Sequence, residues 1–374
     1  METSTVSKNW TFSPGTILNE SNNFDLDICQ IDAQEDYICQ AALFIRSVLL
    51  PIIVAAGLFG NFFNFIIMMT PANRQMTYCL FFAALSVSDN IVLLGSIIHL
   101  VKENTALDRL TGSKCCSAYA FSFNVGSSCS AYFIVFITFL KFNALCNIFK
   151  KQREITRKTA LIWILVITLV CVILNLPVIF TANLLNQTAC VSYFQFRMFS
   201  KVWVYVVTIL FFVIPVVLVT YWNIRIYYKI HKRAKGTMDS TQSNSVPMPL
   251  FRIGSSENHT SQQDLVGSSN DCSSRNQDSG ISSNVSNKDT ERKVSKMILL
   301  ISAAFVFLCL PQYLRHVILL NLQRIEVKFL ISNITNTLFN VNHAINFYLY
   351  CLSGAKFRND FLNILKIRCK WMKK

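Results

Sequence analysis

Residues 116–141 read CSAYAFSFNVGSSCSAYFIVFITFLK, and the rest of the chain is organised around this stretch. Every side chain between its first and last residue is uncharged, and its length exceeds the roughly 20 residues that a helix needs to cross a bilayer. Small residues let neighbouring helices approach closely. They gather near its middle, at Gly126, Ser127, Ser128, Ser130 and Ala131. The stretch therefore predicts a central membrane-spanning helix that is packed on several sides.

The composition of the whole chain is that of a membrane protein. Its 374 residues are 52% hydrophobic and 15% charged, whereas soluble domains carry about 25% charged residues. The formal net charge is +15, but membrane proteins concentrate Lys and Arg on their cytoplasmic side. We therefore expect the basic charge to face anionic lipid and cytosolic partners, and nucleic acid is not an expected partner.

Seven apolar runs predict an all-α membrane protein, a seven-transmembrane helix bundle within residues 41–353. Each run is long enough to span a bilayer. The runs cover residues 41–70, 77–101, 113–146, 157–180, 200–230, 292–321 and 327–352. The segments after the first, third, fifth and seventh runs are the basic ones, which places the amino terminus outside the cell. A multi-pass protein of the plasma membrane is expected.

The first 40 residues are expected to be an extracellular tail. Residues 1–40 are polar and mildly acidic, and they lack the pattern of a cleavable signal peptide. The sequons at Asn9 and Asn19 are glycosylation sites if this end is extracellular.

Two further segments are expected on the cytoplasmic side. Residues 234–291 are rich in Ser, Asn, Gln and Asp, which predicts a disordered loop. Residues 354–374 are predicted to form an amphipathic helix and a tail on the inner membrane surface. The apolar stripe of that helix holds Phe357, Phe361, Leu362 and Leu365. Cys369 beyond the stripe is either a palmitoylation site or a plain cysteine.

Residues inside the runs carry a resemblance to a known family. Asp89 ends the sequence LSVSD in the second run, and an ionisable residue within a span is read as functional by default. The residues that complete the pattern are Gly60, Asn61, Trp163, Pro215 and Pro311. Together they resemble the rhodopsin-like (class A) G-protein-coupled receptors across all seven spans. This resemblance implies a cell-surface receptor for an extracellular ligand, with a heterotrimeric G protein and arrestin as partners inside.

The same resemblance locates the residues of the activation switch and shows where this sequence departs from the family's motifs. NFYLY at 346–350 stands where the family has NPxxY, so that Phe347 replaces the proline. LKF at 140–142 stands for Asp-Arg-Tyr, and Cys309 replaces the toggle tryptophan. The residues implied in switching and G-protein coupling are Lys141, Glu291, Phe305, Cys309, Asn346 and Tyr350.

Two residues of this set form a candidate lock. A pair of Lys141 and Glu291 would hold the cytoplasmic ends of spans three and six together. The alternative is two solvated end charges, because exposed ion pairs contribute little.

The resemblance also implies a disulfide bond between Cys116 and Cys190, the latter in an outer loop that carries a sequon at Asn186. The pairing of Cys29, Cys39 and Cys115 stays open.

Four positions match those that hold a sodium ion in the family: Asp89, Ser130, Asn342 and Asn346. A carboxylate with hydroxyl and amide oxygens suits a hard cation. The alternative is a buried hydrogen-bonded network without an ion. His343, where the family usually has serine, favours that alternative because its imidazole competes with a cation. No other cofactor is expected.

The ligand is expected to be a neuropeptide. Phe123 stands where aminergic receptors have an aspartate, and Asn340 stands where opsins have the retinal-binding lysine, which argues against both ligands. The residues expected to line the outer cavity are Phe123, Asn124, Gln312, Tyr313, His316 and Lys102, with Arg315 near the rim. Aromatic side chains with scattered amides and bases suit a peptide. Lipid and nucleoside ligands remain open.

Two other classes of function remain as alternatives. The first is a receptor-like dimer partner or scaffold with lost or altered signalling, because three switch motifs are altered together. The second is a transporter, which would need paired repeats and broken helices at mid-membrane. An enzyme is not expected, because the histidines fall in separate segments without triad or metal-ligand spacing.

Overall fold

The computed structural model describes residues 37–104, 108–146, 155–185, 189–192, 197–243, 276–320 and 322–371. The first six helical segments are α2 (Tyr37–Phe44), η1 (Ile45–Leu49), α3 (Leu50–Met68), α4 (Thr77–Asn104), α5 (Asp108–Cys146) and α6 (Arg157–Thr181). The remaining ones are α7 (Arg197–Thr208), η3 (Ile209–Val213), α8 (Ile214–Ser243), α9 (Asn276–Leu320), α10 (Ile325–Ala344), α11 (Asn346–Ser353) and α12 (Ala355–Trp371). An antiparallel pair, β1 (Ala182–Leu185) and β2 (Ala189–Ser192), links α6 to α7.

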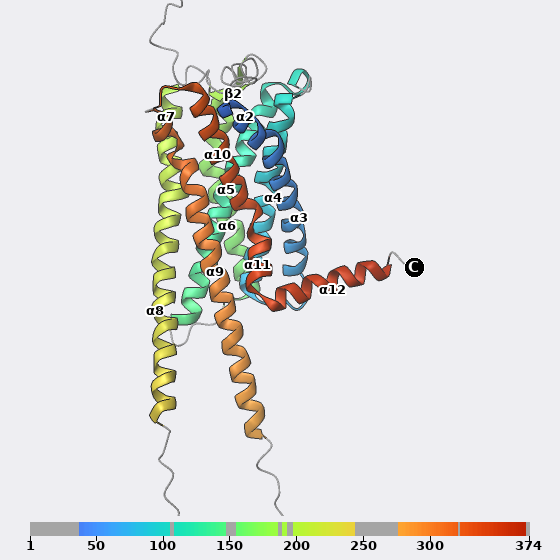
Figure 1. Cartoon of the computed structure of the whole chain (residues 1–374), viewed down its shortest axis with the longest axis vertical. Helices are drawn as coiled ribbons and strands as arrows, with labels where there is room; N and C mark the ends of the chain where they lie inside the picture. The colour runs from blue at the N-terminus through green and yellow to red at the C-terminus, as the bar shows by residue number, and fades with distance from the viewer. Residues whose placement is uncertain are drawn as a thin grey trace, which may run out of the picture.

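The helices form one bundle, with most axes close to the long axis of the molecule and α12 turned away from it at one end (Figure 1). Six helical stretches among the described residues are long and apolar enough to cross a membrane. They are Tyr37–Met68, Thr77–Ile98, Ser117–Leu145, Arg157–Phe180, Val202–His231 and Ser295–Arg315. The seventh predicted run forms α10 and α11.

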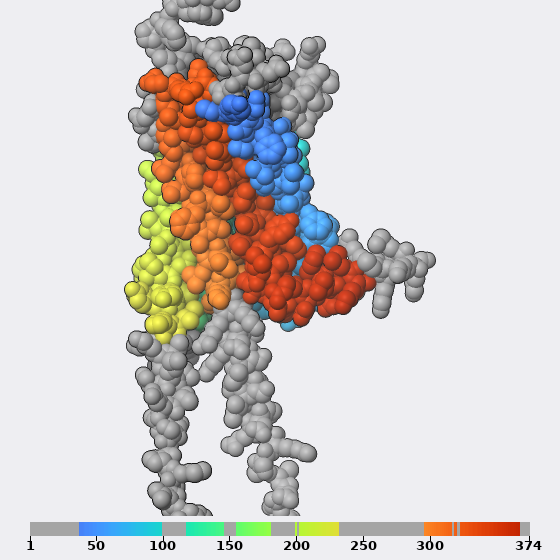
Figure 2. All heavy atoms as spheres, in the orientation of Figure 1, coloured from blue at the N-terminus to red at the C-terminus, as the bar shows by residue number. Residues whose placement is uncertain are grey.

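The seventh run is less apolar because its polar side chains face the inside of the bundle. Buried polar residues of α10 include Asn333, Thr335, Thr337, Asn340, Asn342 and His343. α10 contacts α9, α3 and α4, and Figure 2 shows α9 and α10 side by side on one face of the molecule. Apolarity, the signal used to recognise spans in the sequence, is thus weakest where the polar core is built.

The stretch at 116–141 occupies the centre, as its composition predicts. α5 contacts α4, α6, α8 and α9. In its most apolar window 56% of residues are buried, against 11% for α6. The outer face of α6 is therefore a surface for lipid, whereas α5 is enclosed by protein.

Both π-helical segments end two residues before a proline. η1 ends two residues before Pro51, and η3 ends two residues before Pro215. Proline has no backbone N–H, and its ring clashes with the carbonyl four residues earlier. A wider π turn relieves that clash inside an otherwise regular helix, so these two prolines account for the local geometry of the first and fifth spans.

Close contact of α3 with α10 and α11 depends on two glycines. A Cβ added at Gly57 would lie 2.6 Å from Cβ of Ala344, and one at Gly60 would lie 2.9 Å from Cβ of Phe347. Neither position has room for a larger side chain without a shift of the neighbouring helix. The glycine of the Gly60-Asn61 motif is thus a packing residue.

The predicted amphipathic helix is present as α12, but the side chains of its apolar stripe do not all face the same environment. Phe357 is buried against Phe347 and Tyr350, and Phe361 packs on Phe63. Leu362 is 48% exposed and points away from the bundle. The stripe therefore docks mainly on protein, and Leu362 is left for a surrounding bilayer.

The helices also extend further than the sequence predicts. α8 continues to Ser243 and α9 begins at Asn276, so both ends of the segment 234–291 that was expected to be disordered are helical. Residues 244–275 between them lie outside the described residues. So do the predicted glycosylation sites Asn9, Asn19 and Asn186.

Candidate functional site

A carboxylate buried in the middle of the bundle is the centre of the site. Asp89 on α4 has no solvent exposure. Ser130 Oγ from α5 donates to its Oδ1 at 2.7 Å, and His343 Nδ1 from α10 lies 2.7 Å from the same oxygen. Asn346 Nδ2, at the start of α11, donates to Oδ2 at 2.7 Å. Residues far apart in the sequence thus converge on one acidic group.

His343 is held in place from three sides. Its ring packs against Phe339 with the centroids 4.8 Å apart, and its backbone oxygen accepts a hydrogen bond from Asn61 Nδ2 at 2.9 Å. A carboxylate is an acceptor only, so the ring nitrogen that faces Asp89 carries the hydrogen. The other ring nitrogen, Nε2, is buried without a hydrogen-bond partner among the described residues.

A second polar contact lies beside this one. Ser96 Oγ of α4 donates to Asn340 Oδ1 at 2.6 Å. The contact joins α4 to α10, as the pair of Asp89 and His343 does. Buried polar groups need such partners, because leaving one unpaired costs about 1–3 kcal/mol. The hydrogen bonds therefore help to fix how α10 sits against α4.

The structure brings together only part of the predicted sodium site. Ser130 and Asn346 both bond to Asp89, whereas Asn342 is buried but has no described hydrogen bond to that carboxylate. Ser130 and Asn346 both direct hydrogens to the carboxylate, which uses acceptor sites on each of its oxygens. The imidazole of His343 stands against Oδ1, where a cation would bind. The residues present therefore fit a closed hydrogen-bonded network and do not fit a sodium ion.

Described residues at the end of the bundle near β1 and β2 include four of the predicted ligand contacts. Phe123 packs on Phe339 at 5.7 Å between centroids, and Tyr313 stacks on Phe212 at 4.4 Å. Asn124 Nδ2 donates to the carbonyl of Ala120 within its own helix.

Three polar atoms near this end are buried without a hydrogen-bond partner among the described residues. They are Oε1 of Gln312, Nε of Arg315 and Nε1 of Trp203. The residues belong to α9 and α7. Trp203 is a candidate that the sequence did not single out, although a tryptophan near the end of a span is a signal that could have found it. The side chains of Lys102 and His316 lie outside the described part.

The switch positions extend from the middle of the bundle, where Cys309 lies one helical turn from Tyr313 on α9, into the half that carries α12. Cys309, Phe305 and Tyr350 are buried. Phe305 lies 6.3 Å from Phe212, and Tyr350 packs on Phe82 at 5.0 Å, both between ring centroids. The predicted toggle position is thus a small thiol in a packed core.

Three predicted features involve side chains that lie outside the described residues. The side chain of Glu291 lies outside the described residues, and so do those of Cys116, Cys190 and Cys369. The lock of Lys141 with Glu291, the disulfide and the palmitoylation site therefore stay predictions. Cys39 is disulfide-bonded, with a partner that is not among the described side chains.

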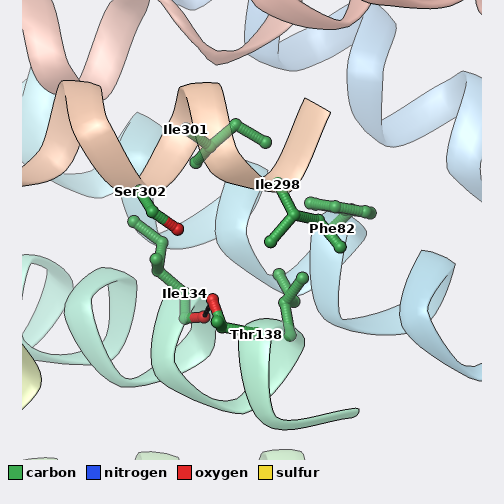
Figure 3. A pocket seen from close by; sticks show the side chains of 7 residues that line it. Phe82, Ile134, Thr138, Ile298, Ile301 and Ser302 are labelled. Carbon is green, nitrogen blue, oxygen red and sulfur yellow. Dashed lines mark hydrogen bonds between the residues drawn. The ribbon is translucent and has the colours of Figure 1, made fainter. Parts of the chain in front are cut away.

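A narrow apolar cavity lies between α4, α5 and α9 in this half (Figure 3). It is too narrow to hold a water molecule. It is lined by Phe82, Ile134, Ile137, Thr138, Ile298, Ile301 and Ser302. Oγ of Ser302 is buried without a hydrogen-bond partner among the described residues. The side chains of the three helices therefore leave only a narrow gap at this level.

The comparison with known families agrees with the fold and the site. Residues 60–350 match the family described as 7 transmembrane receptor (rhodopsin family). The match covers most of the chain, and the chain belongs to this family. A search of the curated proteins found no match.

Membership accounts for the bundle as a multi-pass membrane protein with a seventh span formed by α10 and α11. Receptors of this family in general take an extracellular ligand and act on an intracellular G protein, and they are generally not enzymes. Among the described residues no cluster of three or more His, Cys, Asp or Glu side chains could hold a metal ion.

Proposed function

We propose that this protein is a plasma-membrane receptor for an extracellular peptide, with its amino terminus outside and a heterotrimeric G protein as its partner inside. The observation that carries the ligand class is the set of unpaired polar atoms near β1 and β2. Gln312 Oε1 needs a donor, whereas Arg315 Nε and Trp203 Nε1 need acceptors. A peptide backbone supplies both, in N–H and C=O groups, whereas an ammonium ligand supplies donors only.

Energetics support this proposal. Each buried group without a partner costs about 1–3 kcal/mol, and a ligand that pairs it recovers part of that free energy. The partly buried aromatic rings of Phe123 and Tyr313 add apolar surface, and apolar surface with a few polar groups is the usual composition of a ligand site. Arrestin is a further proposed partner on the inner side.

The experiment is a peptide-library screen on cells that express the full chain, with calcium and cyclic-AMP readouts. We expect at least one peptide to give a saturable response. Gln312→Leu should then raise the half-maximal concentration about tenfold, which corresponds to the loss of one hydrogen bond of about 1.4 kcal/mol. The matched control is Leu314→Ala on the same helix, because Leu314 is 44% exposed on the lipid-facing side. Equal responses of both variants would contradict the proposed ligand site.

A second candidate function is a receptor-like partner that no longer signals. It is favoured by the packed thiol of Cys309 at the toggle position, since a thiol has no indole ring to rotate. Silence of the wild-type chain across the library, with normal surface expression and no basal activity, would favour this candidate over the first.

A further inference from the structure

We propose that His343 permanently takes the place of the sodium ion in the core of this receptor, so that its stability does not respond to sodium. The starting point is the position of the ring. His343 Nδ1 lies 2.7 Å from Asp89 Oδ1, and both side chains are almost completely buried. A cation at this oxygen would have to occupy the point where the imidazole nitrogen already stands.

Two further acceptor sites of the carboxylate are also used. Ser130 and Asn346 each donate to Asp89 at 2.7 Å. A carboxylate has about four lone-pair sites, and three of them face protein donors here. The carboxylate therefore has few acceptor sites left for a cation, and the one nearest the ring is occupied by His343 Nδ1.

The difference between a bound ion and a histidine is that the histidine cannot leave. Its ring is wedged against Phe339, and its backbone is tied to Asn61 on α3. The group that connects α10 to Asp89 on α4 is therefore a side chain of the protein itself, which is always present. A diffusible cation would make the same connection depend on its concentration.

The test is the melting temperature of the purified full-length receptor in NaCl and in choline chloride at equal ionic strength, so that screening is the same. Four forms are compared: wild type, His343→Ser, Asp89→Asn and the double variant. Serine is the residue that resemblance to the family places at position 343, and it removes the ring while it keeps a hydroxyl group.

We expect wild type to melt at the same temperature in both salts. His343→Ser should gain a saturable, sodium-specific rise of about 2–4 °C, because a ligand that binds only the folded state stabilises it. The rise should be absent from the double variant, which lacks the carboxylate.

Two results would overturn the proposal. The first is a saturable sodium-specific rise in wild type that Asp89→Asn abolishes, and this comparison decides the matter even if His343→Ser does not fold. The second is a folded His343→Ser that gains no response to sodium, because another group would then be excluding the ion. The readout is thermal stability, so the result does not depend on whether the receptor signals.

Discussion

At the scale of single residues, the polar core and the cavity below it are maintained in different ways. Asp89 is satisfied by three protein donors, whereas Ser302 has a buried hydroxyl group without a partner. An unpaired buried hydroxyl lowers stability. Hydrogen bonds therefore fix the arrangement of the helices around Asp89, whereas the hydroxyl group of Ser302 adds no such bond.

The first prediction concerns that hydroxyl group. Ser302→Ala should leave the melting temperature unchanged or raise it by about 2–4 °C, the equivalent of about 1 kcal/mol, because the unpaired oxygen is removed. Ser302→Val should lower it instead, because the gap between α5 and α9 is too narrow even for a water molecule and the added methyl group would overpack it. Thermal unfolding of the purified receptor measures both. A clear loss of stability in Ser302→Ala would mean that the hydroxyl group has a partner in the folded state.

At the scale of elements, small residues and aromatic rings decide how the helices meet. α3 approaches α10 and α11 through Gly57 and Gly60, and α12 docks through Phe357. These contacts connect the helix that carries Asn61 with those that carry His343 and Asn346. The element contacts therefore support the geometry around Asp89.

The second prediction tests the approach of α3 to α10. Gly57→Ala should destabilise the receptor by about 1–3 kcal/mol, because the new methyl group would lie 2.6 Å from Cβ of Ala344 and overpack the interface. Ile52→Ala on the same helix is the matched control, since Ile52 is 60% exposed toward lipid. Thermal unfolding should separate the two variants, and equal melting temperatures would contradict the packing described.

The third prediction tests the docking of α12. Phe357→Ala should cost about 3 kcal/mol or more, because Phe357 is buried and its ring contacts Phe347 and Tyr350. Leu362→Ala should have a small effect, since that side chain faces away from the bundle. Proteolytic release of α12, followed by mass spectrometry, should be faster in the first variant. Equally slow release in both would argue against docking through Phe357.

At the scale of the whole molecule, the sequence predicted the class of fold because spans leave a strong signal. Long uncharged runs and the asymmetry of Lys and Arg depend only on composition, so the stretch at 116–141 could be recognised as a central helix. The helical extensions of α8 and α9 into residues 234–291 were missed, because polar composition does not exclude helix when the helix continues a span.

The site was predictable only in part, for reasons that particular residues show. Asp89, Ser130 and Asn346 could be placed together by resemblance, and they do meet. The pair of Ser96 with Asn340 could not be found, because it depends on the relative rotation of two helices. His343 was recognised as a competitor of a cation, but only its position 2.7 Å from Asp89 indicates that it fills the site.

We propose that this rhodopsin-family receptor still signals although its switch residues are altered. The most direct measurement is guanine-nucleotide exchange by purified heterotrimeric G proteins on the full chain reconstituted in lipid vesicles, with and without the pooled peptide library. We expect the library to raise the exchange rate, Gln312→Leu to lower this gain and Leu314→Ala to keep it. An exchange rate equal to that of empty vesicles, with and without the library and for every G protein, would contradict it.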